Sequence, residues 1–269
     1  MIFKKNSSVA SLDNNYLELC KDAYKNDEIF NNFRNLKDYK NILEHVDKDL
    51  AVKYFNNIKN ISTLSNKEII KICDALSTIG SPELVEIIAG EDPISLTSLR
   101  YLNVALDIKN KFKESSFQNV VEIGPGYGGQ SVILNHFFDI KKYTYIDLPE
   151  VNGLIKRFIE NHNLKFSTEY KTLNDSLLYE NIDLVISNYA FSELNYKLQL
   201  RTINNLINKS KYCYMIINSD SFKNNIKYKR FKFMNKEELL KNISNSSLDK
   251  EIPTTAKGNY LLLKNQSRN

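Results

Sequence analysis

Apolar residues recur at helical spacing through the first part of the chain. Leu17, Cys20 and Tyr24 lie three or four positions apart, and the apolar positions of residues 42–46 and 69–76 follow the same rule. Such spacing places side chains on one face of a helix. We therefore predict that residues 1 to about 117 are mainly helical.

Several helix ends in this region carry local signals. Ser65 is followed three residues later by Glu68, which is typical of a capping box at a helix start. Ser81-Pro82-Glu83 places proline at a first helical position with apolar residues between 84 and 88 behind it, so we predict a helix there as well. A longer helix over Ser95–Lys111 is expected to lead into the next part of the chain.

The pattern changes to alternating strands and helices after about residue 118. Runs such as 184–186 and 215–217 are apolar at every position, as expected for a parallel sheet covered by helices on both faces. We predict an α/β fold, with a helical N-terminal cap over residues 1–94, an α/β domain over residues 95–269, and a final hairpin within Leu248–Lys264. The predicted strands are Asn119–Ile123, Tyr143–Asp147, Phe166–Tyr170, Asp183–Asn188 and Tyr212–Asn218, and the helices are Gly129–Phe138, Val151–Asn161 and Asn195–Lys209.

Composition limits the class of protein and its expected location in the cell. Of its 269 residues, 42% are hydrophobic and 26% are charged, which is ordinary for a soluble globular protein. No apolar run reaches the ~18–20 residues of a membrane span, and the first residues lack the apolar core of a signal peptide. The three cysteines lie far apart, which argues against a disulfide framework or a zinc site. We expect a cytoplasmic protein without a membrane span or a bound metal.

The charge distribution bears on the partner. A net charge of +5 would suit an acidic small substrate, such as a nucleotide-linked one. The densest basic run, Lys223–Lys232, is interpreted as a solvated loop, and a patch that attracts phosphates or an anionic glycan is the alternative. Because no RNA- or DNA-binding motif accompanies it, we expect no nucleic-acid partner.

The most specific signal is the glycine-rich segment Val120–Gly129, which holds four of the eight glycines of the chain. An apolar run precedes the glycines and a helical pattern follows them. This order predicts a strand, a tight turn and a helix N-terminus, where α/β sheets hold nucleotide-like ligands. Gly124, Gly126 and Gly129 also match the dinucleotide-binding pattern.

An acidic residue before these glycines distinguishes a dinucleotide from a cationic nucleoside ligand. Glu122 lies at the predicted strand end, where it would repel the pyrophosphate of a dinucleotide. It would attract S-adenosylmethionine, whose sulfonium and ammonium groups are cationic. Asp147 ends the next predicted strand and can accept hydrogen bonds from both ribose hydroxyls, a role that NAD enzymes share. The alternative interpretation of Asp147 is a helix cap or a turn residue.

Four segments together carry a family resemblance. Glu122–Gln130, Asp147–Val151, Ser187–Leu194 and Glu251–Asn259 resemble the sugar O-methyltransferases of bacterial surface-polysaccharide clusters, and Ser98–Leu102 fits the same family. The resemblance implies a seven-stranded class I methyltransferase sheet with its last strand inserted antiparallel. It also implies a helical N-terminal part that covers the cleft, S-adenosylmethionine as methyl donor, and a sugar hydroxyl of a capsule or lipopolysaccharide precursor as acceptor. The acceptor sugar could be free, nucleotide-linked or part of a glycan.

The candidate donor site combines these strand ends with neighbouring residues. Arg100 and Tyr101 are expected to reach the carboxylate of the donor, although a solvated arginine is the simpler interpretation. Asp175 follows the third predicted strand, where these folds commonly place a polar residue that contacts adenine, and it could equally be a plain loop residue. The expected donor-binding residues are Glu122, Gly124, Gly126, Asp147, Asp175, Asn188, Arg100 and Tyr101.

The acceptor side needs a base, because a sugar hydroxyl is a poor nucleophile and a positioned base contributes ~10²–10⁴-fold. None of the three histidines, His45, His136 and His162, follows the fourth strand, where the acceptor should lie. Glu193 in the loop after that strand is our first candidate, either as the base or as the group that orients the hydroxyl. Its alternative role is a carboxylate stabilised by a helix N-terminus. Glu251 in the C-terminal hairpin is the second candidate.

Other classes of protein stay open at this stage. A NAD-dependent sugar dehydrogenase or epimerase would need a Tyr-x-x-x-Lys pair, whereas Tyr189 is followed four residues later by Glu193. A non-catalytic protein that binds S-adenosylmethionine, and methylation of another small-molecule oxygen or nitrogen, are the remaining alternatives.

Overall fold

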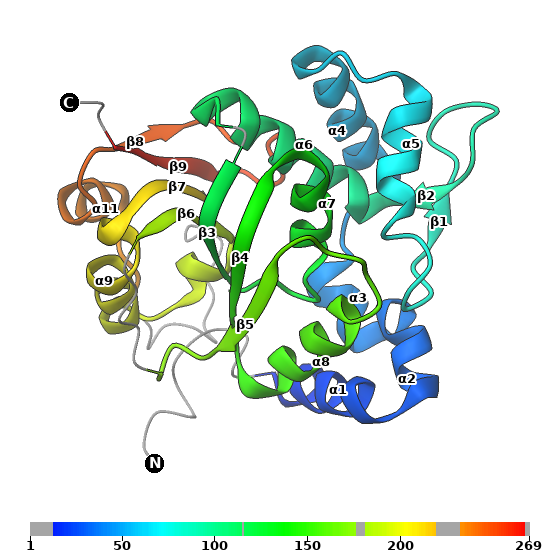
Figure 1. Cartoon of the computed structure of the whole chain (residues 1–269), viewed down its shortest axis with the longest axis horizontal. Helices are drawn as coiled ribbons and strands as arrows, with labels where there is room; N and C mark the ends of the chain where they lie inside the picture. Colours follow the sequence, from blue (N-terminus) through cyan, green and yellow to red (C-terminus); the bar gives the residue numbers. More distant parts are fainter. Residues whose placement is uncertain (1–12, 115, 176–180, 219–231, 267–269) are drawn as a thin grey trace.

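A mixed sheet of seven strands lies at the centre of the chain (Figure 1). The computed structural model describes residues 13–114, 116–175, 181–218 and 232–266. The strands are β3 (Ser116–Ile123), β4 (Asp139–Ile146), β5 (Ser167–Lys171), β6 (Ile182–Asn188), β7 (Ser210–Ile217), β8 (Ser246–Asp249) and β9 (Tyr260–Asn265).

The order across this sheet is β5-β4-β3-β6-β7-β9-β8. Neighbouring strands from β5 to β7 are parallel. The last strand, β9, runs antiparallel between β7 and β8. This arrangement confirms the sheet that the family resemblance implied. The parallel strands place the carboxyl ends of β3, β4 and β6 at one edge, where the candidate residues begin.

Helices cover both faces of the sheet. Adjacent residues of one strand face opposite sides, so Val120 joins one hydrophobic cluster and Val121 the other. The first cluster includes side chains of α6 (Leu96–Phe112), α7 (Gly129–Phe137) and α8 (Pro149–Ile159). The second includes those of α9 (Tyr196–Asn205) and α11 (Lys236–Asn242). A short 3-10 turn, η4 (Ile207–Lys209), follows α9, so the predicted helix Asn195–Lys209 is interrupted.

The N-terminal part is helical, as predicted, and packs on the face of the sheet that carries the first hydrophobic cluster. Its α1 contacts α8, and α4 and α5 contact α6. The capping box of Ser65 and Glu68 is present at the start of α5. Large side chains of this part, such as Phe33 and Tyr39, belong to the same hydrophobic cluster as the sheet. The elements are α1 (Asn14–Lys25), α2 (Asp27–Asn32), η2 (Phe33–Asn35), α3 (Lys37–Leu43), α4 (Lys48–Ile61) and α5 (Asn66–Asp74).

The predicted helix after Ser81 is wrong. Residues 84–95 instead form a small antiparallel ribbon of β1 (Leu84–Val85) and β2 (Ile94–Ser95). Gly80 and Ser81 have φ of 82° and 50°, so the chain enters this segment in a left-handed conformation that does not begin a helix. The apolar residues that suggested a helix are half-buried or exposed, so no buried face stabilises one.

Two further expectations concern features outside the sheet. Of the basic run Lys223–Lys232, residues 223–231 lie outside the described residues, and Lys232 is exposed. No helix within the described ranges is long and apolar enough to cross a membrane.

Candidate functional site

Two neighbouring side chains pack closely against the glycine turn between β3 and α7. Gly124 and Gly126 have φ of 67° and 63°, in the left-handed region that favours glycine. A Cβ on Gly124 would lie 2.0 Å from the Cβ of Ala190, and one on Gly126 would lie 3.2 Å from a methyl group of Leu43. The turn is therefore closed in on one side by the segment after β6 and on the other by the end of α3.

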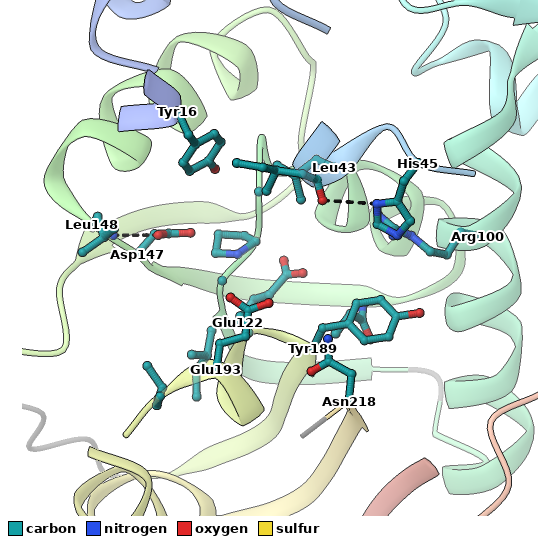
Figure 2. A pocket seen from close by; sticks show the side chains of 18 of the residues that line it. Tyr16, Leu43, His45, Arg100, Glu122, Asp147, Leu148, Tyr189, Glu193 and Asn218 are labelled. Atoms are coloured by element: carbon teal, nitrogen blue, oxygen red, sulfur yellow. Dashed lines mark hydrogen bonds between the residues drawn. The ribbon is translucent and has the colours of Figure 1, made fainter. Parts of the chain in front are cut away.

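A cavity of about 810 Å³ opens beside this turn (Figure 2). Its floor consists of the residues that follow β3, β4 and β6, and the N-terminal helices supply the opposite wall. The structure thus brings most of the predicted site residues together around one space. Those that line it are Arg100, Tyr101, Glu122, Gly124, Gly126, Asp147, Asn188 and Glu193.

Glu122 is the most deeply buried acid of the cavity. Its side chain is 2% exposed, and its Oε2 accepts a hydrogen bond of 2.6 Å from the hydroxyl of Tyr143. Burial raises the pKa of Glu122 to about 7, although the Tyr143 hydrogen bond acts in the opposite direction. The carboxyl group is therefore partly protonated at neutral pH when nothing else is bound.

Two more carboxyl groups share this property. Burial raises the pKa of Asp147 to about 7, opposed by the backbone N–H of Leu148, which donates to Oδ1 at 2.7 Å. Burial and the charge of Asp147 raise the pKa of Glu193 to about 7. Within the described residues, no salt bridge involves Glu122, Asp147 or Glu193. The cavity is therefore suited to a cationic ligand, which would favour the ionised form of all three.

Unsatisfied polar groups also face this space. Arg100 is 4% exposed, and its guanidinium carbon lies 5.1 Å from the ring centre of Tyr101 and 6.0 Å from that of Tyr189. Neither the Nε of Arg100 nor the buried Oδ1 of Asn188 has a hydrogen-bond partner within the described part of the chain. Buried polar groups are rarely left unpaired, so both atoms are candidates for ligand contacts.

Glu251 lies behind the cavity wall and does not line it. Its side chain is 5% exposed and accepts hydrogen bonds from the hydroxyl of Tyr189 at 2.8 Å and the backbone N–H of Thr255 at 2.9 Å. Tyr189 itself has a φ of 77°, which is unusual for a residue with a side chain. Through these hydrogen bonds Glu251 connects the C-terminal loop with Tyr189, a strained residue that lines the cavity.

Asp175 also lies outside the lining. It is exposed, and its Oδ2 accepts a hydrogen bond of 2.6 Å from the backbone N–H of Thr172. This contact closes a turn after β5, which matches the plain loop interpretation. The neighbouring residues Thr172, Leu173 and Asn174 line the cavity instead.

The N-terminal helices contribute residues that the sequence did not indicate. Tyr16 of α1, Leu43 of α3 and His45, just after α3, all line the cavity (Figure 2). Leu43 followed helical spacing and resembled an ordinary core residue, and no pattern singled out Tyr16. His45 stood alone among helices, and no motif connected it with the strand ends. Within the described residues, no group of three or more His, Cys, Asp or Glu side chains could hold a metal ion.

Comparisons with known proteins find similarity in structure only. No protein-family model and no curated protein sequence matches the chain. A candidate S-adenosylmethionine-dependent methyltransferase from Methanococcus maripaludis is 17% identical over 83% of this chain and 95% of its own, with a TM-score of 0.44. An O-methyltransferase family protein from Burkholderia thailandensis is 12% identical over 64% of this chain and 57% of its own, with a TM-score of 0.47.

A third solved structure is the N-terminal domain of EvdMO1, determined with S-adenosylhomocysteine and D-fucose. It is 10% identical over 61% of this chain and 82% of its own, with a TM-score of 0.48. At these identities and TM-scores the likeness concerns the fold, and the chemistry must be argued from the residues of the cavity.

Proposed function

We propose that this protein transfers a methyl group from S-adenosylmethionine to a hydroxyl group of a sugar. The observation that carries the proposal is the convergence of Glu122, Asp147 and Glu193, without salt bridges among the described residues, on one cavity beside a glycine turn. A dinucleotide would bring two phosphates into this acidic space, whereas a sulfonium and an ammonium group would be stabilised there. The donor supplies an activated methyl group.

The residues around the turn fit the parts of this donor. We assign Asp147 to the ribose hydroxyls and Glu122 to the positively charged methionine end, next to the backbone of Gly124 and Gly126. Arg100 lines the cavity, and its buried Nε has no hydrogen-bond partner among the described residues, which fits a partner for the donor carboxylate, with Tyr101 beside it. Asn188 can satisfy its buried Oδ1 with a donor N–H group.

The two predicted acids on the acceptor side receive different roles. Glu193 lines the cavity close enough to Asp147 for their charges to interact, so we place it at the reacting methyl group, where it orients the acceptor hydroxyl. Glu251 is engaged with Tyr189 and Thr255, so we assign it to positioning Tyr189 and not to proton transfer. Holding the two reactants in line accounts for most of the acceleration.

The part of the cavity away from Asp147 fits a polyhydroxylated acceptor. It offers hydroxyl, amide and charged groups together with the ring of Tyr189, which can pack against the face of a sugar. We therefore favour a nucleotide-linked or free sugar of polysaccharide biosynthesis, and we place the reaction in the cytoplasm with residues 1–94 as the cover of the site. The hydroxyl, amide and charged groups in this acceptor part of the cavity belong to Lys53, Asn218, Thr254, Thr255 and Asn259.

Two measurements test this proposal. Isothermal titration calorimetry should detect binding of S-adenosylmethionine and S-adenosylhomocysteine and no binding of NAD. Mass spectrometry should then detect one added methyl group on a member of a panel of UDP- and GDP-linked hexoses. Binding of NAD alone would reject the methyltransferase assignment. Donor binding with transfer only to amines would replace the sugar with another acceptor class.

A further inference from the structure

The segment between α3 and α4 places a histidine in the cavity, on the side away from Asp147. Figure 2 shows His45 beside Arg100, with Tyr189 nearby and Asp147 at the other end of the site. We infer that His45 is the general base of the acceptor site and that its Nε2 accepts the proton of the hydroxyl being methylated. This inference rests on the proposed function, and it assigns the proton to a residue of the N-terminal cover.

The hydrogen bond of His45 determines which ring nitrogen is available. Its Nδ1 lies 3.2 Å from the carbonyl oxygen of Ile42. A carbonyl oxygen can only accept, so Nδ1 must carry the hydrogen in this contact. The neutral ring then has its lone pair on Nε2, which is the nitrogen not engaged by the backbone.

The surroundings keep the imidazole neutral. Although His45 is exposed at its surface, partial burial of its ring, followed by the positive charge of Arg100, lowers the pKa of His45 below its usual range, and the Ile42 carbonyl and the nearby Glu44 act in the opposite direction. At neutral pH the ring is therefore unprotonated and ready to accept a proton. Glu193 shows the contrary behaviour, because its raised pKa leaves it partly protonated before the donor binds.

A weak base is sufficient for this reaction. The hydroxyl proton becomes strongly acidic only as the new oxygen–methyl bond forms and the sulfur–methyl bond breaks. His45 Nε2 takes that proton, the thioether leaves uncharged, and the imidazolium next to Arg100 readily loses the proton to solvent. Charge and atoms balance without a metal or another co-reactant.

The other two histidines provide matched controls. His136 lies on α7 and His162 follows α8, and neither lines the cavity. With the hexose nucleotide that the wild-type protein methylates fastest, H45Q should lower kcat at least ~100-fold and change the affinity for S-adenosylhomocysteine less than about threefold. H136Q and H162Q should stay within about twofold of the wild-type kcat.

Chemical rescue separates a base from a merely structural side chain. Added imidazole should restore part of the activity of His45→Ala, and the restored rate should follow the unprotonated fraction of imidazole as pH changes. An H45Q variant with nearly wild-type kcat would overturn the inference, and loss of the reaction in E193Q but not in H45Q would move the base to Glu193. A wild-type protein that fails to bind S-adenosylhomocysteine would instead reject the proposed function.

The tautomer gives a readout that needs no acceptor. Nitrogen NMR of the imidazole rings, with His45 assigned by its loss in H45Q, should show the hydrogen on Nδ1 in the free protein and in the complex with S-adenosylhomocysteine. A dominant Nε2–H form would leave no lone pair for the acceptor proton, and the inference would then be wrong.

Discussion

The hydroxyl of Tyr143 donates a 2.6 Å hydrogen bond to Oε2 of Glu122 in the interior of the site. Both side chains are fully or almost fully buried, and this bond opposes the effect of burial on the pKa of Glu122. Tyr143 thus helps to keep a buried carboxyl group available as an anion. The pair connects a core residue of β4 with a carboxyl group that lines the cavity at the end of β3.

Removing this hydroxyl should weaken donor binding in a pH-dependent way. In Tyr143→Phe the pKa of Glu122 should rise further, because a hydrogen bond to its ionised form is lost. We expect the affinity for S-adenosylmethionine to fall about tenfold at neutral pH and the difference from wild type to shrink near about pH 9. Calorimetry at both pH values measures this effect. An equal loss at both would show that Tyr143 acts by packing alone.

Donor binding should release protons. The pKa values of Glu122, Asp147 and Glu193 are raised to about 7, and a cation favours their ionised forms. Affinity for S-adenosylmethionine should therefore increase as pH rises through about 7, until the amino group of the donor itself begins to lose its proton near about pH 8. Titrations in buffers of different ionisation enthalpy should report release on the order of one proton at neutral pH. Uptake of protons, or no linkage, would contradict the proposed cation site.

Asp147 should matter to the donor, and Asp175 should not. Both acids follow neighbouring strands, but only Asp147 lines the cavity. Asp147→Asn should reduce the affinity for S-adenosylhomocysteine at least about tenfold, because hydrogen bonds to a charged group are lost. Asp175→Asn, the matched control, should bind normally. Similar losses in both variants would point to a general disturbance of this sheet edge.

The loss of stability caused by a close contact at the glycine turn can be measured separately from the loss caused by a left-handed backbone conformation. Gly124→Ala puts a Cβ 2.0 Å from that of Ala190 at a φ of 67°, whereas a Cβ on Gly90, with a φ of 79°, meets nothing within 4 Å. Gly90→Ala should lower the free energy of unfolding by about 1 kcal/mol. Gly124→Ala should cost about 2–4 kcal/mol and abolish donor binding. Urea denaturation measures both variants, and equal costs would mean that Ala190 simply moves away.

The sequence predicts the sheet and its strand ends better than it predicts how the N-terminal helices of residues 1–94 lie over them. β3 and β6 each contain a short apolar run near the carboxyl end, so Glu122 at the end of β3 and Glu193 in the turn after β6 could be placed at one edge from local pattern alone. His45 and Tyr16 reach that edge through contacts between distant segments, which local periodicity does not encode. The error after Ser81 has a related cause, because Gly80 and Ser81 adopt left-handed conformations that a proline signal does not reveal.

The contact between Leu43 and Gly126 bears on how fast such an enzyme could turn over. Because the end of α3 lies against the glycine turn, we predict that release of a product from the donor half requires this helix to shift. Release of S-adenosylhomocysteine would then limit the steady-state rate, so added viscogen should slow turnover while a single-turnover burst stays fast. We also expect S-adenosylhomocysteine to inhibit the reaction strongly.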